Sequence, residues 1–329
     1  MGEIHSAEAP ANIALIKYMG KKEAAGNQPT NSSLSYTLNH LLSRVEIMAL
    51  PQGEEDRWEP LRQAPWEILT LSPEGQARFL KFFRRLKGEW KIPGSYLLRS
   101  ANNFPADCGV ASSASSFAAL TRATFELARS ESEKSKALDS WSQEDLARWS
   151  RQGSGSSCRS FFSPWSLWQG EGARGVALPW PHLHHQLVLV ETEKKQVASS
   201  SAHLRVSSSL LFTGRPERAE LRLESLLQAL NMQNWAEAFE WVWAEMWDMH
   251  ALFETSSPSF GYMTPASLRV LLDMRRLWQE EKDGPLVTMD AGANVHLLWR
   301  PDQREMALNV EAQVLGGERV LRSPGLVKQ

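Results

Sequence analysis

Short apolar segments with an alternating or continuous pattern predict β-strands in the first third of the chain and again near its middle. Residues 33–38 (SLSYTL) and 44–50 (RVEIMAL) are strand candidates within a β-rich stretch over residues 1–60. Residues 95–100 (SYLLRS) predict a further strand. Residues 185–192 (HQLVLVET) predict a buried strand that begins a second lobe.

Apolar residues at helical spacing predict several amphipathic helices. A serine stands in the N-cap position of two of them, at Ser72 before Pro73 and at Ser142 three residues before Asp145. The apolar positions predict helices over residues 77–90, 117–128, 144–152, 216–230, 235–253 and 264–281.

Two short apolar runs, residues 286–290 and 295–299, lie on either side of the turn AGAN, which predicts a β-hairpin. Strands and helices are mixed along the chain without the strict alternation of a βαβ protein. The pattern therefore predicts the α+β fold class. We expect two lobes, residues 1–184 and residues 185–329.

Composition narrows the class of protein. The chain has 329 residues, a formal net charge of −2 and 42% hydrophobic residues, as in a globular protein with room for two sizeable cores. The near-neutral charge argues against a nucleic-acid-binding protein. No run of 18 apolar residues predicts a membrane span, and the first ten residues do not resemble a signal peptide. Two cysteines cannot form a disulfide framework, so we expect a protein of the reducing cytoplasm.

Residues 105–116 (PADCGVASSASS) place small side chains at the start of the helix predicted over residues 117–128. The first backbone N–H groups of a helix lack intrahelical acceptors and carry partial positive charge. Ser112 and Ser113 lie at this position. A serine there either caps the helix or helps to bind a phosphate group, and the segment alone does not distinguish the two.

A second segment of small residues covers residues 153–160 (GSGSSCRS). Its glycines permit close approach of the backbone to a ligand, and its hydroxyls together with Arg159 could hold a carboxylate or a phosphate. The same composition is typical of a flexible surface loop. The segment lacks the G-x-S-x-G spacing of a serine-hydrolase elbow.

Lys17, Tyr18, Lys21 and Lys22 bring three cations and a phenol together within six residues. Clustered lysines usually form a solvated surface. Lys17 differs from the others because it follows the apolar run 13–16, which predicts a partly buried ammonium group near an acid.

Asp290 ends the first strand of the predicted hairpin and enters a turn of small residues. Aspartate at such a position commonly binds the backbone of its own turn. A catalytic carboxylate is the alternative.

Other candidate motifs are weaker. His182, His184 and His185 have no cysteine or carboxylate at metal-ligand spacing, so we expect no metal site there. His250 lies in a helix rich in Trp and Met, where we expect a buried or helix–helix histidine. The sequence contains neither a Walker A motif nor G-x-G-x-x-G after a strand.

The segments occur in an order that resembles the mevalonate diphosphate decarboxylase family, within the galactokinase, homoserine kinase, mevalonate kinase and phosphomevalonate kinase superfamily. The family patterns N-I-A-L-I-K-Y-W-G-K and N-S-S-L-S-x-T-L resemble residues 12–21 and 31–38. The patterns N-N-F-P-T-A-A-G-L-A-S-S-A-S-x-F-A-A-L, R-x-G-S-G-S-A-C-R-S, M-H-A and T-M-D-A-G-P-N-V resemble residues 102–120, 151–160, 249–251 and 288–295. The resemblance spans nearly the whole chain.

The resemblance implies an N-terminal ATP-binding lobe like ribosomal protein S5 domain 2 and a C-terminal α+β lobe that completes the substrate site. It implies a reaction of the mevalonate pathway of isoprenoid biosynthesis that uses ATP and Mg2+. In this reaction (R)-5-diphosphomevalonate is phosphorylated on its C3 hydroxyl and then loses phosphate and CO2 to give isopentenyl diphosphate. It also implies a homodimer, with no metal ligands supplied by the chain itself.

The resemblance further implies roles for individual residues. Asp290 would accept the hydroxyl proton, Lys17 would keep that carboxylate ionised and stabilise the transferred phosphoryl group, and Arg159 would hold the substrate carboxylate. The nucleotide would lie against Ser100, Asn102, Gly109, Ser112 and Ser113. The substrate diphosphate would lie against Tyr18, Lys21, Ser154 and Ser156.

Some positions depart from the family patterns. Met19 stands in place of a tryptophan, and Asp107 and Cys108 precede the loop glycine, where they place an acid near the expected phosphates. Ser200 stands where bacterial relatives often have an arginine that binds the diphosphate. Arg205 is the nearest residue that could substitute for it.

These departures keep two alternatives open within the superfamily, a phosphomevalonate decarboxylase and a mevalonate-type kinase. A catalytically silent nucleotide-binding paralogue is the alternative outside catalysis. The presence of Lys17, Arg159 and Asp290 favours a decarboxylase over each of them.

Overall fold

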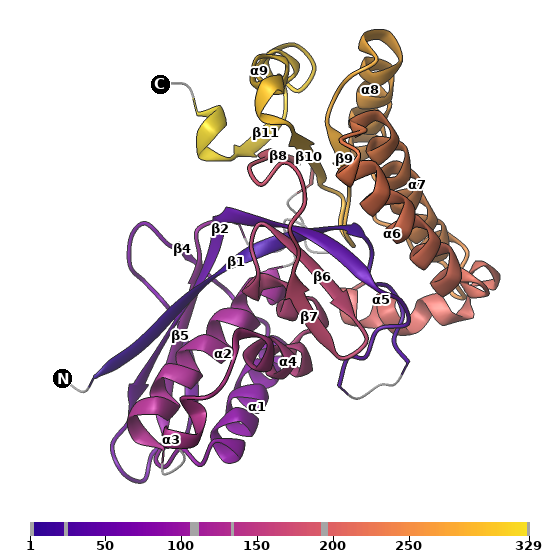
Figure 1. Cartoon of the computed structure of the whole chain (residues 1–329). Coiled ribbons are helices and arrows are strands. Elements are labelled where there is room, and N and C mark those ends of the chain that lie inside the picture. Colours follow the sequence, from indigo (N-terminus) through magenta and orange to yellow (C-terminus); the bar gives the residue numbers. More distant parts are fainter. Residues whose placement is uncertain (1–2, 23–25, 106–111, 133–134, 192–196, 328–329) are drawn as a thin grey trace.

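The computed structural model describes residues 3–22, 26–105, 112–132, 135–191 and 197–327, and in them helices and strands are mixed around two β-sheets (Figure 1). The predicted α+β class is confirmed. Among the described residues, no helix is both long and apolar enough to cross a membrane.

The first sheet is built on two long antiparallel strands, β1 (Ile4–Ile16) and β2 (Ser33–Ala49). The last six residues of β1 are all buried, which explains why all of them except Asn12 are apolar, and the strand carries the chain into the interior at Lys17. The other strands of this sheet are β3 (Arg57–Pro60), β4 (Glu67–Ile68), β5 (Tyr96–Asn102), β6 (Trp165–Gln169) and β7 (Gly172–Gly175). The order is β3-β5-β2-β6-β7, with β1 paired to β2 and β4 to β5.

The two strands predicted over residues 33–38 and 44–50 are one strand, β2, so that division was wrong. The register with β1 shifts between Pro10 and Ala11, and residues 39–41 of β2 have no partner in β1. An irregular bulge absorbs these residues without ending the strand. The bulge depends on how β2 pairs with β1, so the sequence pattern of β2 alone could not predict it.

The helices α1 (Pro73–Glu89), α2 (Ser112–Glu131) and α4 (Gln143–Gly153) cover one face of the first sheet (Figure 1). The N-caps predicted for α1 and α4 are confirmed: Ser72 accepts a hydrogen bond from the Gly75 N–H, and Ser142 forms a capping box with Asp145. The short helices α3 (Ser135–Leu138) and η1 (Gly155–Phe161) lie before and after α4 in the chain. An aromatic core of Phe and Trp side chains fills the space between these helices and the sheet.

The second sheet is antiparallel, with the order β11-β8-β10-β9. Its strands are β8 (His184–Leu189), β9 (Leu286–Thr288), β10 (Val295–Trp299) and β11 (Arg319–Arg322). The predicted hairpin is confirmed by the pairing of β9 with β10. The sheet begins at His184, next to the predicted lobe boundary, which itself stays a prediction.

Three long helices, α6 (Arg215–Asn231), α7 (Trp235–Glu254) and α8 (Pro265–Glu281), lie along one side of the second sheet (Figure 1). The long connection between β8 and α6 contains α5 (Ser199–Arg205), η2 (Val206–Ser208) and η3 (Leu210–Phe212). The remaining elements are η4 (Pro301–Gln303), α9 (Arg304–Gln313) and η5 (Pro324–Leu326).

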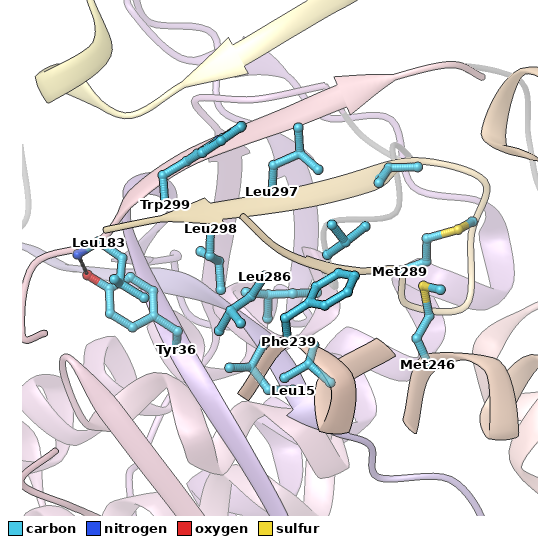
Figure 2. Close-up of a cluster of buried hydrophobic side chains, with 14 of the residues drawn as sticks. Leu15, Tyr36, Leu183, Phe239, Met246, Leu286, Met289, Leu297, Leu298 and Trp299 are labelled. Carbon is cyan, nitrogen blue, oxygen red and sulfur yellow. Dashed lines mark hydrogen bonds between the residues drawn. The ribbon is translucent and has the colours of Figure 1, made fainter. Parts of the chain in front are cut away.

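One buried core joins the two sheets. Leu15 of β1 and Tyr36 of β2 pack in the same cluster as Leu286 and Leu298 of the second sheet and Phe239 of α7 (Figure 2). Their packing brings the end of β1 close to the turn between β9 and β10. These are the two places from which the sequence predicts catalytic residues.

Candidate functional site

An ion pair between Lys17 and Asp290 lies at the centre of the site. Lys17 follows β1 directly, and its Nζ lies 2.8 Å from Oδ1 of Asp290, two residues beyond β9. The backbone N–H of Lys17 donates to Oε1 of Glu245, and the Asn31 amide donates to the Lys17 carbonyl, both at 2.9 Å. Lys17 is only 2% exposed, so the prediction of a buried lysine beside an acid is confirmed.

Burial and charge oppose each other at this pair. Burial by itself would raise the pKa of Asp290, but the charge and the hydrogen bond of Lys17, together with the charges of His296 and Arg159, outweigh it and hold the pKa below its ordinary value. Burial lowers the pKa of Lys17, and the carboxylates of Asp290 and Glu245 oppose that shift. Among the described residues, the Asp290 side chain hydrogen-bonds to Lys17 and to no backbone N–H of its own turn. The carboxylate is therefore held ionised and is 19% exposed, as a proton acceptor for a bound hydroxyl must be.

Arg159 lies in the segment that the composition presented as either a loop or an anion site. The segment is a buried helical turn, η1, rather than a flexible surface loop. The Nε of Arg159 donates to Oδ1 of Asn12 at 3.0 Å, and Nη1 donates to Oγ of Ser33 at 2.9 Å. Within the described residues Nη2 has no acceptor, which leaves one edge of the guanidinium for a ligand.

Lys17, Arg159 and Asp290 line one pocket. Its other lining residues are Ala14, Tyr18, Met19, Ser156, Ser199, His203, Met249 and Ala291. The pocket encloses about 70 Å³, which is smaller than the roughly 300 Å³ at the lower end of ligand sites. A ligand larger than this volume would extend beyond the lining residues or displace them.

The residues predicted to bind nucleotide fall into two groups. Ser112 and Ser113 occupy the first turn of α2, as predicted, and Oγ of Ser113 lies 3.2 Å from Oγ of Ser154. Ser100 and Asn102 are buried on β5, where Ser100 accepts from the Trp58 indole at 2.8 Å and Asn102 accepts from a serine hydroxyl. Neither of these β5 side chains lines the pocket.

Three positions in the segment that precedes α2 in the sequence carry predictions. Gly109 was expected to contact the nucleotide, and Asp107 and Cys108 were departures from the family pattern. All three lie outside the described residues.

The residues predicted to bind the substrate diphosphate are only partly brought together. Tyr18 and Ser156 line the pocket, whereas Lys21 and Ser154 do not. Nζ of Lys21 donates instead to Oδ1 of Asn27 at 2.7 Å. Arg205, which was also predicted to bind the diphosphate, and Ser200 lie on α5.

Arg205 and Ser200 are both on α5 but outside the pocket lining. The guanidinium of Arg205 lies over the ring of Phe260, 5.1 Å from its centroid. Ser200 is exposed. Neither side chain supplies a cation to the pocket in this structure.

Sequence reasoning missed several residues of the site. Asn12 and Ser33 lie inside motifs that were recognised, but their hydrogen bonds to Arg159 were not foreseen. Glu245 forms a buried ion pair with Arg215, in which both side chains are fully buried, and also holds the Lys17 backbone. His203 lines the pocket from α5. The contacts of Asn12 and Ser33 with Arg159 and of Glu245 with Lys17 join residues 126 to 228 positions apart, and no local pattern reveals them.

Three of the remaining histidines, His185, His250 and His296, are buried, whereas His182 is exposed. His250 is 3% exposed on α7, as expected for a core histidine. His185 contacts Nε2 of His40 at 3.1 Å and Nδ1 of His296 at 3.0 Å. Among the described residues there is no group of three or more His, Cys, Asp or Glu arranged to hold a metal ion.

Comparison with known proteins identifies the family. The family model described as the diphosphomevalonate decarboxylase-like N-terminal domain matches residues 9–176, and the mevalonate 5-diphosphate decarboxylase C-terminal domain matches residues 186–322. The diphosphomevalonate decarboxylase of Ganoderma lucidum is 33% identical over 315 residues, which cover 88% of this chain and 76% of that protein.

Solved structures agree with this result. The crystal structure of a mevalonate diphosphate decarboxylase from Legionella pneumophila has a TM-score of 0.89 and 43% identity, and the match covers 97% of this chain and 100% of that one. The structure of MDDEF in complex with MVAPP, AMPPCP and magnesium has a TM-score of 0.83 and 25% identity, over 97% of this chain and 96% of that one. The predicted two-lobed small-molecule-kinase fold is confirmed. The chain belongs to the diphosphomevalonate decarboxylase family.

Proposed function

We propose that the pocket of Lys17, Arg159 and Asp290 is the reaction centre of a diphosphomevalonate decarboxylase. The enzyme converts (R)-5-diphosphomevalonate and ATP to isopentenyl diphosphate, ADP, phosphate and CO2. The observation that carries this assignment is the Lys17–Asp290 ion pair in one pocket with Arg159.

Asp290 acts first in this mechanism. Its carboxylate orients the C3 hydroxyl and accepts the hydroxyl proton while the oxygen attacks a phosphoryl group. Lys17 keeps the carboxylate ionised beforehand and lies where negative charge develops on the phosphoryl oxygens. The ion pair thus serves both the base and the transferred group.

Arg159 acts in the second stage. Its Nη2 edge holds the substrate carboxylate, and Asn12 and Ser33 fix the guanidinium. The C3–O bond breaks and phosphate leaves with the bonding electrons. The C1–C2 bond then breaks, its electrons form the C2–C3 double bond, and CO2 departs. Holding the carboxylate in this way aligns the C1–C2 bond with the electron-poor C3 centre, so that loss of CO2 competes with capture of that centre by water.

ATP, when bound, supplies the phosphoryl group that turns the C3 hydroxyl into a leaving group. The first turn of the 20-residue helix α2, with Ser112 and Ser113, fits phosphate oxygens because its N–H groups lack helical acceptors. Ser112 is half-buried and Ser113 is exposed, so both hydroxyls are within reach of a ligand. Since the described residues contain no cluster of metal ligands, Mg2+ would be held mainly by phosphate oxygens. We keep Ser100, Asn102 and Gly109 as predicted nucleotide contacts, although Ser100 and Asn102, like Ser112 and Ser113, do not line the pocket.

For the diphosphate we propose Tyr18 and Ser156, which line the pocket, together with Lys21 and Ser154 beside them. Arg205 is the weakest member of this set because its guanidinium packs on Phe260. It would have to leave that ring to reach a ligand.

The decisive experiment measures ADP release and CO2 from Asp290→Asn. Removing the base should lower turnover by about 100- to 10,000-fold and leave ATP binding nearly unchanged. Asp302→Asn, a change at an exposed carboxylate, is the matched control and should retain wild-type turnover. CO2 release at the wild-type rate from Asp290→Asn would remove Asp290 from its role.

The same assay distinguishes the related enzymes. Wild-type protein is tested with (R)-5-diphosphomevalonate and (R)-5-phosphomevalonate side by side. We expect turnover of the diphosphate with one CO2 per ADP. Faster turnover of the monophosphate would indicate the sister decarboxylase, and ADP without CO2 would indicate a kinase.

We also propose a cytoplasmic homodimer that does not bind nucleic acid. The net charge of −2 and the free, buried Cys158 support this description. Exposed apolar side chains on α6 and α8, with Leu221 at 60% and Leu272 at 61% exposure, are available for a subunit contact. Light scattering after size exclusion measures the subunit number directly. The proposed lobes remain residues 1–184 and 185–329.

A further inference from the structure

One imidazole, that of His203, lines the pocket among the described residues, and the mechanism above does not use it. His203 projects from α5, which belongs to the connection between β8 and α6. Its ring lies against the Tyr18 ring, with the centroids 4.2 Å apart and the planes 37° from parallel. This contact fixes the plane of the imidazole at the wall of the pocket.

A backbone hydrogen bond sets the tautomer of this ring. The N–H of Gly20 donates to Nδ1 of His203 at 3.2 Å. Nδ1 is therefore an acceptor, and the neutral ring carries its proton on Nε2. Burial, reinforced by the charges of Lys21 and Arg159, lowers the pKa of His203 to about 3, so the ring is neutral near pH 7.

The second nitrogen remains available. No described residue accepts a hydrogen bond from Nε2, although Nδ1 and the ring face are both engaged. A hydrogen-bond donor in the lining of a polar pocket favours a ligand that carries a hydrogen-bond acceptor. The cations Lys17 and Arg159 line the same pocket as His203 beside the single carboxylate of Asp290, and this lining favours an acceptor that belongs to an anion.

Other side chains of α5 do not take this role. Arg205 packs on Phe260, and Ser200 lies outside the pocket lining. His203 and Ser199 are the two α5 residues that line it. A nitrogen donor for an anion at this wall can therefore come from His203.

We propose that His203 donates a hydrogen bond from Nε2 to a phosphate oxygen of the substrate diphosphate and is a specificity residue for that group. The inference rests on the proposed function, which places the diphosphate beside Tyr18 and Lys21. A neutral donor contributes to binding without adding a third positive charge beside Lys17 and Arg159. It therefore recognises the shape and reach of the ligand more than its total charge.

Three substitutions separate the donor from the rest of the ring. His203→Gln places an amide N–H near the position of Nε2. His203→Met removes the donor and keeps the length of the side chain. His203→Asn can still accept from Gly20 but is too short to reach the ligand. Leu204→Met, at an exposed neighbour on the same helix, is the matched control.

The measurements are the Kd for (R)-5-diphosphomevalonate by titration calorimetry without nucleotide, and kcat and KM with ATP. Loss of a hydrogen bond to a charged group should raise Kd and KM about 10- to 100-fold in the Met and Asn variants, with kcat nearly unchanged. His203→Gln should restore most of the affinity, and Leu204→Met should match wild type. Circular dichroism melting shows that each variant is folded.

The outcomes are distinct. A wild-type enzyme that decarboxylates the substrate, combined with wild-type Kd in folded His203→Met or His203→Asn, overturns the His203 inference alone. The inference is equally overturned if His203→Gln binds as weakly as His203→Asn, because the donor then is not what matters. A wild-type protein that neither binds nor turns over the diphosphate overturns the proposed function, and the inference with it.

Discussion

Mild acid should destabilise this fold through histidines that are buried without charge. His185 is 1% exposed and His296 is fully buried, and the two rings are joined by a 3.0 Å contact between their nitrogens. His40 continues the row at 3.1 Å. Nε2 of His296 is buried and has no hydrogen-bond partner among the described residues. Protonating these rings inside the core would place charges next to each other in a medium that solvates them poorly.

The direction of the histidine pKa shifts determines whether acid stabilises or destabilises the fold. Burial lowers the pKa of His296 to about 3 and that of His40 to about 4, and it also lowers the pKa of His185. These folded-state values lie below the unfolded value of 6.5. The neutral rings therefore contribute full stability above pH 6.5, and that stability is lost as the pH falls from 6.5 toward the folded values.

The magnitude can be worked out for one ring. Between pH 7.5 and 5.5 an unfolded histidine takes up nearly one proton that the folded ring refuses, which costs about 1.4 kcal/mol of unfolding free energy. His185 and His296 together should cost about 3 kcal/mol over this interval, as an upper value. Carboxylates titrate mainly below this interval, so they add little to the change.

Urea unfolding followed by tryptophan fluorescence at pH 7.5, 6.5 and 5.5 measures this loss, since the chain has 14 tryptophans. His296→Met removes one of the rings. It should reduce the loss between pH 7.5 and 5.5 by about 1.4 kcal/mol, whatever its effect at pH 7.5. His182→Met, at an exposed ring, should leave the pH dependence as in wild type. Equal losses for wild type and His296→Met would refute the reasoning.

Two further predictions concern the pocket. Arg159→Lys should lower kcat/KM about 100-fold, because one ammonium cannot keep the hydrogen bonds to Asn12 and Ser33 and also hold a carboxylate. Steady-state kinetics on a folded variant test this prediction, and near-normal activity would exclude the proposed role of Arg159. Gly155→Ala would place a Cβ 2.6 Å from Cε1 of Tyr18. The new methyl group should displace the Tyr18 ring and raise the KM for the diphosphate severalfold. An unchanged KM would show that Tyr18 does not contact the substrate.

Local signals predicted the helices well because their information is local. Ser72, Ser142 and Thr264 all cap helices whose apolar positions could be read directly from the sequence. The segment 153–160 left two interpretations open for the opposite reason. Its small residues suit a flexible loop in isolation, but here they permit tight packing: a Cβ at Gly153 would lie 2.3 Å from the Phe117 ring. Burial of a segment by distant partners is not encoded in its own composition.

The residues of the site likewise include some that a local pattern could predict and some that it could not. Lys17 and Asp290 could be predicted because each follows an apolar strand, where a charged side chain is conspicuous. Glu245 could not, since a glutamate on an amphipathic helix is usually a surface residue. It is fully buried here because Arg215 neutralises it and the Lys17 N–H uses one of its oxygens. That arrangement exists only after α6, α7 and β1 have packed together.

The two residues of the ion pair, Lys17 and Asp290, come from different sheets, and this affects how substitutions of either residue must be interpreted. Lys17 comes from the end of the first sheet and Asp290 from a turn of the second, so their 2.8 Å contact is also a contact between the sheets. Asp290→Asn removes the base and at the same time leaves a buried ammonium without its counter-charge, which costs about 3–5 kcal/mol for a fully buried pair. Part of this cost is relieved because Asp290 is 19% exposed and Glu245 lies near Lys17. Activity lost with ATP binding and melting temperature retained therefore reports on the base, whereas a parallel fall of all three reports on the contact between the sheets.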